Sequence, residues 1–123
     1  MPGVPAFILR RLYVKGSLGN FEGGWRFKLK NSLGSGYAKA MTPLTLDGRE
    51  VTLADSSFEI DGRQTRFDQV DEKNTFTLAM NRDIVISVHG EKLPAGVHKV
   101  GMGFIVPGFG KIGFEFTDEV KSG

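Results

Sequence analysis

Three apolar runs between Ile84 and Phe116 constrain the fold more than any other part of the chain. They read IVISV, VHKVGMGFIV and IGFEF, and the turn-forming segments LPAG and PGFG separate them. The runs are rich in Val, Ile and Phe, and a series of short apolar runs bounded by Gly and Pro is typical of consecutive antiparallel strands. We therefore expect these runs to form the centre of a sheet whose inner face carries most of the core.

The rest of the chain shows the same strand-like pattern. Trp25 to Lys30 alternates apolar and cationic residues at a period of two, which predicts a strand with one buried face. Asp47-Gly48 and Asp61-Gly62 each lie between short alternating runs, and this dipeptide favours the type I′ turn of a β-hairpin. Ile8 to Lys15 also alternates and predicts another strand, whereas only Arg66 to Glu72 is compatible with a helical turn.

These patterns predict an all-β protein, an antiparallel β-sandwich (jelly-roll or Ig-like) of about eight or nine short strands with at most one short helical turn. We expect a single domain over residues 1–123, with an N-terminal arm at 1–7 and a flexible tail at 118–123. More than about two-fifths of the residues should be in strands and fewer than about one-tenth in helices. The residues expected to be buried are Trp25, Phe27, Leu29, Phe76, Leu78, Val100, Met102 and Phe104.

Composition excludes several classes of site and partner. The 123 residues contain no cysteine, so neither disulfides nor thiolate metal sites are possible, and a reducing, cytoplasmic location is the simplest interpretation. No apolar stretch approaches the roughly 20 residues of a membrane span. A net charge of +2 is too small to indicate a polyanion partner. We therefore expect neither membrane nor nucleic-acid binding.

Candidate chemical groups are few. His89 and His98 flank the LPAG turn and could form a cross-strand metal pair, but a chance pair at a strand end is the favoured interpretation. Arg26, Lys28 and Lys30 form a basic row, and a solvated face is favoured over a phosphate-binding one because Trp25 and Phe27 must point the other way. Neither a nucleophile motif nor a phosphate loop occurs. The sequence thus predicts no catalytic, cofactor-binding or metal-binding residues in this chain.

Glycines interrupt the last apolar runs, and strand interiors normally avoid them. They lie beside large apolar residues, which indicates either a surface that another chain approaches closely or a bulged, strongly coiled strand. Both interpretations stay open. The predicted interface residues are Gly101, Met102, Gly103, Phe104 and Phe114.

Four segments stand in a suggestive order: WRF at 25–27, LTLDGREV at 44–51, FEIDGRQTRFDQV at 58–70 and KLPAGVHKV at 92–100. From about Gly24 to Val106 this order resembles the small β subunits of bacterial C-glycoside deglycosidases. In this sequence the loop after the first segment, NSLGSGYAKAM, is shorter than in that family. The matching motifs are structural, so the resemblance carries over no functional residue.

The resemblance implies a non-catalytic accessory β-sandwich subunit in carbohydrate metabolism. It would stabilise or complete a larger TIM-barrel subunit, similar to sugar isomerases, which carries a divalent metal and the catalytic residues. This chain would then hold no cofactor and would not be an enzyme by itself. The alternative is a free-standing, homo-oligomeric β-sandwich module that binds an unknown ligand.

Overall fold

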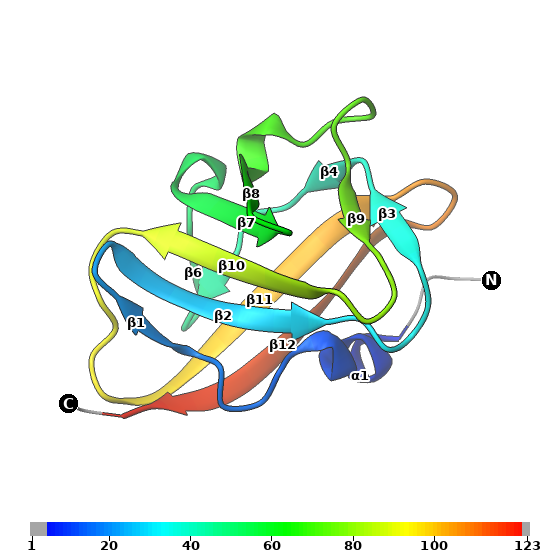
Figure 1. Ribbon diagram of the computed structural model, residues 1–123. Helices are drawn as coiled ribbons and strands as arrows, with labels where there is room; N and C mark the ends of the chain where they lie inside the picture. Colours follow the sequence, from blue (N-terminus) through cyan, green and yellow to red (C-terminus); the bar gives the residue numbers. More distant parts are fainter. Residues whose placement is uncertain (1–4, 122–123) are drawn as a thin grey trace.

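The chain folds into antiparallel β-sheets with very little helix. The computed structural model describes residues 5–121, and 52% of them are in strands and 11% in helices. The predicted all-β class and the predicted strand share are confirmed, and the helical share is marginally above the expected one-tenth. The result is a small β-sandwich-like fold (Figure 1).

The first sheet has the strand order β1-β2-β10-β7-β8, with every neighbouring pair antiparallel. In β2, Trp25, Phe27 and Leu29 are buried and the cationic residues between them are exposed, as the alternation predicted. One face of this sheet therefore builds the core and the other faces solvent. The strands are β1 (Gly19–Phe21), β2 (Gly24–Lys30), β10 (Asp83–His89), β7 (Ser56–Ile60) and β8 (Arg63–Arg66).

The second sheet has the order β12-β11-β5-β6, and β4 pairs with β11 beside β5. A separate two-stranded ladder joins β3 and β9. The described residues hold twelve strands, more than the predicted eight or nine, because Pro43 and neighbouring residues divide one irregular segment into several short pieces. The bounds are β12 (Gly110–Val120), β11 (Gly96–Val106), β5 (Thr45–Leu46), β6 (Arg49–Glu50), β4 (Ala40–Met41), β3 (Gly36–Ala38) and β9 (Phe76–Leu78).

The core lies where β2 and β10 cross obliquely over β11 and β12 (Figure 1). Phe27 of the first sheet meets Phe116 of the second edge-on, with ring centroids 5.0 Å apart. Phe76 of the small ladder similarly contacts Phe104 at 5.7 Å. These separations fall in the range that aromatic pairs prefer. All eight residues expected to be buried belong to this core.

Both Asp-Gly dipeptides form the predicted turns. Asp47 and Gly48 have φ angles of 51° and 87° and connect β5 to β6, and Asp61 and Gly62 have 52° and 83° and connect β7 to β8. Positive φ at both central positions is what a type I′ turn requires. These hairpins are local, so the sequence identifies them directly.

The three apolar runs are not one continuous sheet, which corrects the first expectation. β10 belongs to the first sheet, whereas β11 and β12 form a long hairpin in the second. The segment from Gly90 to Ala95 is a crossover between the layers, held by Asn20, whose amide bonds both the N–H and the C=O of Leu93 at 2.8 and 2.9 Å. Apolar composition predicts strands but does not say to which layer each belongs.

The N-terminal segment also differs from the prediction. Instead of a strand over Ile8 to Lys15, α1 (Ala6–Leu9) runs into the 3₁₀ turn η1 (Arg10–Leu12), and only Tyr13 makes a β-bridge, to Leu29. Leu9 and Leu12 are three residues apart, so one helical face buries both. The other helical segments are two 3₁₀ turns, η2 (Leu53–Asp55) and η3 (Phe67–Gln69), the latter within the range expected to be helical.

Parts of the predicted arm and of the predicted tail belong to regular elements. Residues 6 and 7 of the expected arm belong to α1, and β12 continues through residues 118–120 of the expected tail. Residues 1–4 and 122–123 of those two predictions lie outside the described residues. Within the described range, no helix is long and apolar enough to cross a membrane.

Candidate functional site: an apolar pocket and an outer groove

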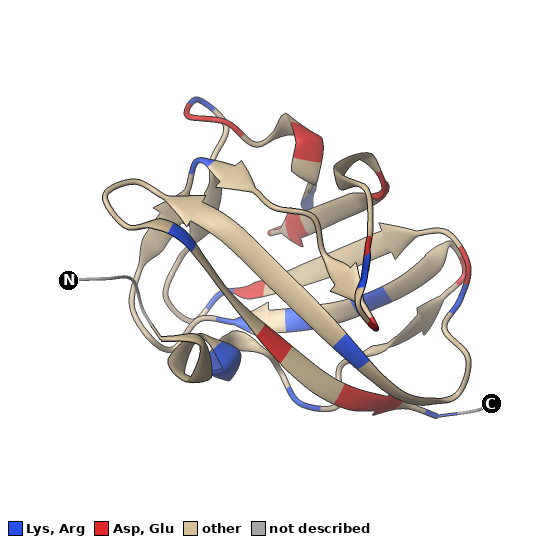
Figure 2. Cartoon of the chain, turned by 180° about the vertical axis from the view of Figure 1, so that it is seen from behind, with Lys and Arg blue, Asp and Glu red and all other residues tan. Residues whose placement is uncertain are grey.

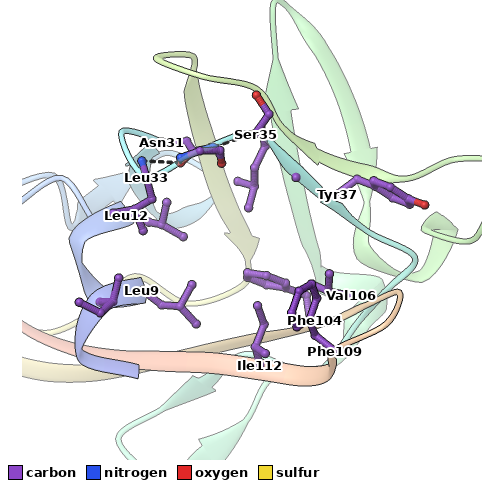
Figure 3. Close-up of a pocket in the computed structure, with 14 residues that line it drawn as sticks. Leu9, Leu12, Asn31, Leu33, Ser35, Tyr37, Phe104, Val106, Phe109 and Ile112 are labelled. Carbon is purple, nitrogen blue, oxygen red and sulfur yellow. Dashed lines mark hydrogen bonds between the residues drawn. The ribbon is translucent and has the colours of Figure 1, made fainter. Parts of the chain in front are cut away.

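A pocket of about 380 Å³ opens between the N-terminal helical segment, the loop after β2, the β3–β9 ladder and the β11–β12 hairpin (Figure 3). It is hereafter called the apolar pocket. Its volume is at the lower end of the range typical of small-molecule sites, roughly 300–1,000 Å³. Its lining residues are Ile8, Leu9, Leu12, Asn31, Leu33, Gly34, Ser35, Gly36, Tyr37, Leu78, Phe104, Val106, Phe109 and Ile112.

The walls of the apolar pocket come from segments far apart in the sequence. α1 and η1 contribute Leu9 and Leu12, which are 4% and 2% exposed and so form a fixed wall. Phe104 of β11 forms another part, and Ile112 of β12 lies across from it, since the two are register partners in the long hairpin. At the mouth, Phe109 remains 51% exposed at the hairpin turn.

Asn31 shapes the loop that forms one wall. Its side chain is 1% exposed, and its Nδ2 donates to the carbonyl oxygens of Gly34 and Leu78 at 2.7 and 2.9 Å. Its Oδ1 accepts from the backbone N–H groups of Leu33 and Gly34 at 3.0 and 3.3 Å. The amide is therefore engaged within the protein, as a buried polar group must be. It organises the loop and offers little to a ligand.

The pocket is suited to apolar groups and not to charged ones. None of its lining residues is Lys, Arg, His, Asp or Glu. Ser35 and Tyr37 carry hydroxyl groups, but both side chains point away from the cavity (Figure 3). A phosphate or carboxylate placed inside would lose water without gaining a partner, which is strongly unfavourable. Acid–base chemistry is equally unsupported at this site.

A second concavity, hereafter the outer groove, lies on the solvent side of β11 and β12. It has a volume of about 310 Å³, with Gly101, Gly103 and Gly113 along its floor. Thr42 and Thr45 approach the floor so closely that a Cβ on Gly103 or Gly101 would meet their Oγ1 atoms at 2.6 and 2.3 Å. The glycines therefore allow the side chains of Thr42 and Thr45, which belong to this same chain, to approach β11 closely.

The predicted interface residues are thus divided between two surfaces. Met102, Phe104 and Phe114 point into the core, at 3%, 1% and 4% exposure, and Phe104 also lines the apolar pocket. Gly101 and Gly103 lie on the opposite face, in the outer groove. Whether another chain docks there stays a prediction.

His98 is the centre of a polar cluster at the other end of β11. Its Nδ1 lies 2.7 Å from Oδ2 of Asp47, and its Nε2 lies 2.8 Å from the carbonyl oxygen of Pro94. An ionised carboxylate and a carbonyl can only accept, so both ring nitrogens donate and the imidazole is cationic. The hydrogen bond that His98 donates to Asp47 raises the pKa of His98, and the same bond lowers the pKa of Asp47.

The role of this cluster is structural. Asp47 also accepts from the backbone N–H of Lys99 at 2.8 Å, so its carboxylate holds the tip of the β5–β6 hairpin against β11. Pro94 belongs to the crossover between the sheets. The protonated His98 thereby joins three elements that no local sequence pattern links.

Tyr13 and Asp118 form a second polar contact, close to the edge of β12. The Tyr13 hydroxyl donates to Oδ2 of Asp118 at 2.6 Å, and the N–H of Gly16 donates to the same oxygen at 2.7 Å. Burial, together with this hydrogen bond, raises the pKa of Tyr13 to about 12, and the bond lowers the pKa of Asp118. The Tyr13 ring also stacks on Phe116. The contact fastens the N-terminal segment to the last strand.

The hypothetical histidine pair does not form. His89 ends β10 in the first sheet, where its ring packs near Phe21, whereas His98 is in the second sheet and fully occupied by Asp47 and Pro94. The crossover separates the two residues instead of pairing them. Among the described residues, no three His, Asp or Glu side chains are grouped so that they could hold a metal ion.

The basic row lies on the exposed face of β2, as expected. The Arg26 guanidinium lies over the Phe21 ring at 5.4 Å, and Lys30 stands opposite Asp83 in the register of β2 and β10. Seen from behind, acidic and basic positions are interspersed over the strands (Figure 2). This arrangement favours the solvated-face interpretation, and the absence of nucleic-acid binding stays a prediction.

The fold and the two concavities together define a small β-sandwich-like domain with an apolar pocket and an outer groove. Comparison with known families then identifies it: the chain belongs to the family described as hydroxymethylglutaryl-CoA reductase, N-terminal domain, whose model matches residues 8–121. No protein with a curated description matches it.

This membership corrects the resemblance to C-glycoside deglycosidase β subunits, which was wrong. The four motifs behind that resemblance are a strand, two Asp-Gly turns and the crossover, all of them structural features that unrelated β-sandwiches can share. The carbohydrate role loses its support with the resemblance. The metal-bearing barrel partner was inferred from it alone and has not been tested.

Proposed function

We propose that this chain is a non-catalytic domain that joins an assembly of the hydroxymethylglutaryl-CoA reductase family through the outer face of its second sheet. Family membership over residues 8–121 supports the association with such a reductase. The observation that supports docking through the outer face is the exposure of Val97. This apolar residue is 67% exposed, and it lies on the same side of β11 as the glycines of the outer groove.

The chemistry of the apolar pocket supports a binding role over a catalytic one. The apolar pocket has no acidic, basic or histidine side chain in its lining, and the titratable groups of His98 and Tyr13 are engaged with partners inside the fold. The coenzyme A moiety named in the family carries phosphates, which this pocket does not suit. We therefore place the reduction itself outside this chain, and a cytoplasmic location remains part of the proposal.

The experiment combines the purified chain with the catalytic region of a hydroxymethylglutaryl-CoA reductase from the same source. The chain alone should consume no hydroxymethylglutaryl-CoA in the presence of NADH or NADPH, and light scattering after gel filtration should show a complex of the two proteins. Val97→Glu should weaken the complex, whereas Lys28→Glu, on the exposed face of the other sheet, should not. Turnover by the chain alone, or equal effects of the two variants, would contradict the proposal.

The second candidate function is a homo-oligomeric binding module. The observation in its favour is the set of exposed aromatic residues near the mouth of the apolar pocket: Tyr37 is 49% and Phe109 51% exposed. A second copy could cover them, since exposed apolar patches often mark contact surfaces. A concentration-dependent oligomer of the chain alone that Phe109→Ser disrupts would support this alternative over the reductase assembly.

A further inference from the structure

We infer that the apolar pocket binds an uncharged small molecule through a hydrocarbon chain, a ligand that neither the family nor the proposed function assigns. The first argument is its volume. A cavity of about 150 Å³ lined by Leu, Ile and Phe holds one benzene ring, and the pocket here has about 380 Å³. By simple proportion it accommodates roughly ten to fifteen carbon atoms, more than a single ring or one side chain of a partner.

The second argument is the chemistry of the walls. The inward-facing side chains are aliphatic or aromatic, among them Leu9, Leu12 and Ile112, and the one buried polar side chain, Asn31, uses its donors and its acceptor on the loop backbone. A ligand with a charged or strongly polar body would therefore leave its polar atoms unpaired. A hydrocarbon chain loses only its apolar contact with water, which is favourable.

The third argument is that the pocket is open space bounded by fixed walls. Gly36 is the register partner of Leu78 in the β3–β9 ladder, and Leu78 lines the pocket, so a Cβ on Gly36 would point to the same side. Such a Cβ would meet no atom within 4 Å. Gly36 is itself exposed, so this open space lies at the mouth of the pocket, where a ligand can enter without displacing the core.

The same geometry supplies a blocking variant and its control. Gly36→Trp should place an indole ring into the pocket without a clash at its Cβ. Gly19→Trp is the matched control because Gly19 is also a strand glycine with open space around its Cβ, and it does not line the pocket. Thermal unfolding of both variants shows whether each still folds.

The experiment titrates the full chain with 1-hexanol, 1-octanol and 1-decanol by isothermal calorimetry, with decanoate as the charged counterpart of decanol. Each added CH₂ should raise the affinity about fourfold, the gain expected from burying one methylene. Decanol should bind more tightly than decanoate because no lining side chain is cationic. Gly36→Trp should lose at least tenfold in affinity for decanol, and Gly19→Trp should retain it.

Three results would overturn the inference. One is affinity that does not depend on chain length, another is tighter binding of decanoate than decanol, and the third is equal binding by the two Trp variants. A further outcome is that the chain binds none of the alcohols and forms an oligomer that Phe109→Ser disrupts. That result would also overturn the inference and assign the mouth of the pocket to contact with a second copy of the chain. Because this titration uses the isolated chain, its failure leaves the reductase assembly untouched, and failure of that assembly leaves the pocket untouched.

Discussion

Replacing His98 should make the stability of the protein less dependent on pH, and the direction of the effect follows from the two hydrogen bonds of its ring. Both nitrogens face acceptors, so the bonds at 2.7 and 2.8 Å require the protonated form. The pKa of His98 is raised above its ordinary value of 6.5. Its contribution to stability is therefore fully present below pH 6.5 and is lost as the pH rises through the folded-state pKa.

The carboxylates around His98 set the lower limit of the pH range in which the interaction stabilises the fold. Asp47 has a pKa lowered from 3.8, so its contribution is present above that value and is lost as the pH falls through its folded-state pKa. Asp118 is the register partner of His98 on β12, and its pKa is lowered as well. The interaction between His98 and Asp47 should thus stabilise the fold most between about pH 4 and pH 6.5.

The size of the effect follows from the burial of the two partners. His98 is 7% exposed, whereas the Asp47 side chain is 48% exposed and can regain water when its partner is removed. Hydrogen bonds to charged groups contribute about 1.5–3 kcal/mol, and the exposure of Asp47 places this one in the lower half of that range. His98→Gln should lower the free energy of unfolding by an amount in the lower half of that range at pH 5.5, and by clearly less at pH 8.5.

Urea unfolding at pH 5.5 and 8.5, followed by the fluorescence of the single tryptophan, measures these free energies. His89→Gln serves as the control because His89 is exposed at the end of β10, in the other sheet. The wild type should lose stability between the two pH values, and His98→Gln should lose less. If His98→Gln costs nothing at pH 5.5, or if its pH dependence equals that of the wild type, the assignment of a cationic His98 is refuted.

Three further predictions concern the core and the edge of β12. Trp25→Ala should cost about 3–5 kcal/mol in urea unfolding because the indole is buried, and a loss below about 1 kcal/mol would place it at a surface. Gly113→Ala should destabilise the protein by about 1–3 kcal/mol, since its Cβ would lie 2.7 Å from the carbonyl oxygen of Met102, while Gly19→Ala should be nearly neutral. In a Tyr37→Phe variant, absorbance titration of the remaining tyrosine should give a pKa of about 12, and a value near 10 would contradict the contact between Tyr13 and Asp118.

The parts of the fold that the sequence predicted are those encoded by neighbouring residues. Alternation identifies the buried and exposed faces of β2 because side chains of a strand point to opposite sides at every step. The Asp-Gly turns are equally local. The helical start was missed because Leu9 and Leu12 fit a helical face, while Ile8, Leu12 and Val14 fit a strand, and a short segment does not distinguish the two periods.

The site could not be predicted because it depends on contacts between distant residues. Asp47 and His98 are 51 positions apart and meet only because β5 pairs with β11. The apolar pocket joins the helical segment at the N-terminus with the hairpin near the C-terminus. Its one local signal was the NSLGSG loop, whose Asn31 is the kind of residue that binds its own backbone in turns.

The contact between Tyr13 and Asp118 also has a consequence for folding, because it joins the two ends of the described chain. These residues are 105 positions apart, as are Arg10 and Glu115, whose Nε and carbonyl oxygen are 2.7 Å apart. Among the described elements, α1 and η1 come before every strand in the sequence, yet they pack against β12, which is the last strand. Contacts of such high sequence separation slow folding. We therefore expect Leu9 and Leu12 to reach their buried positions late in folding.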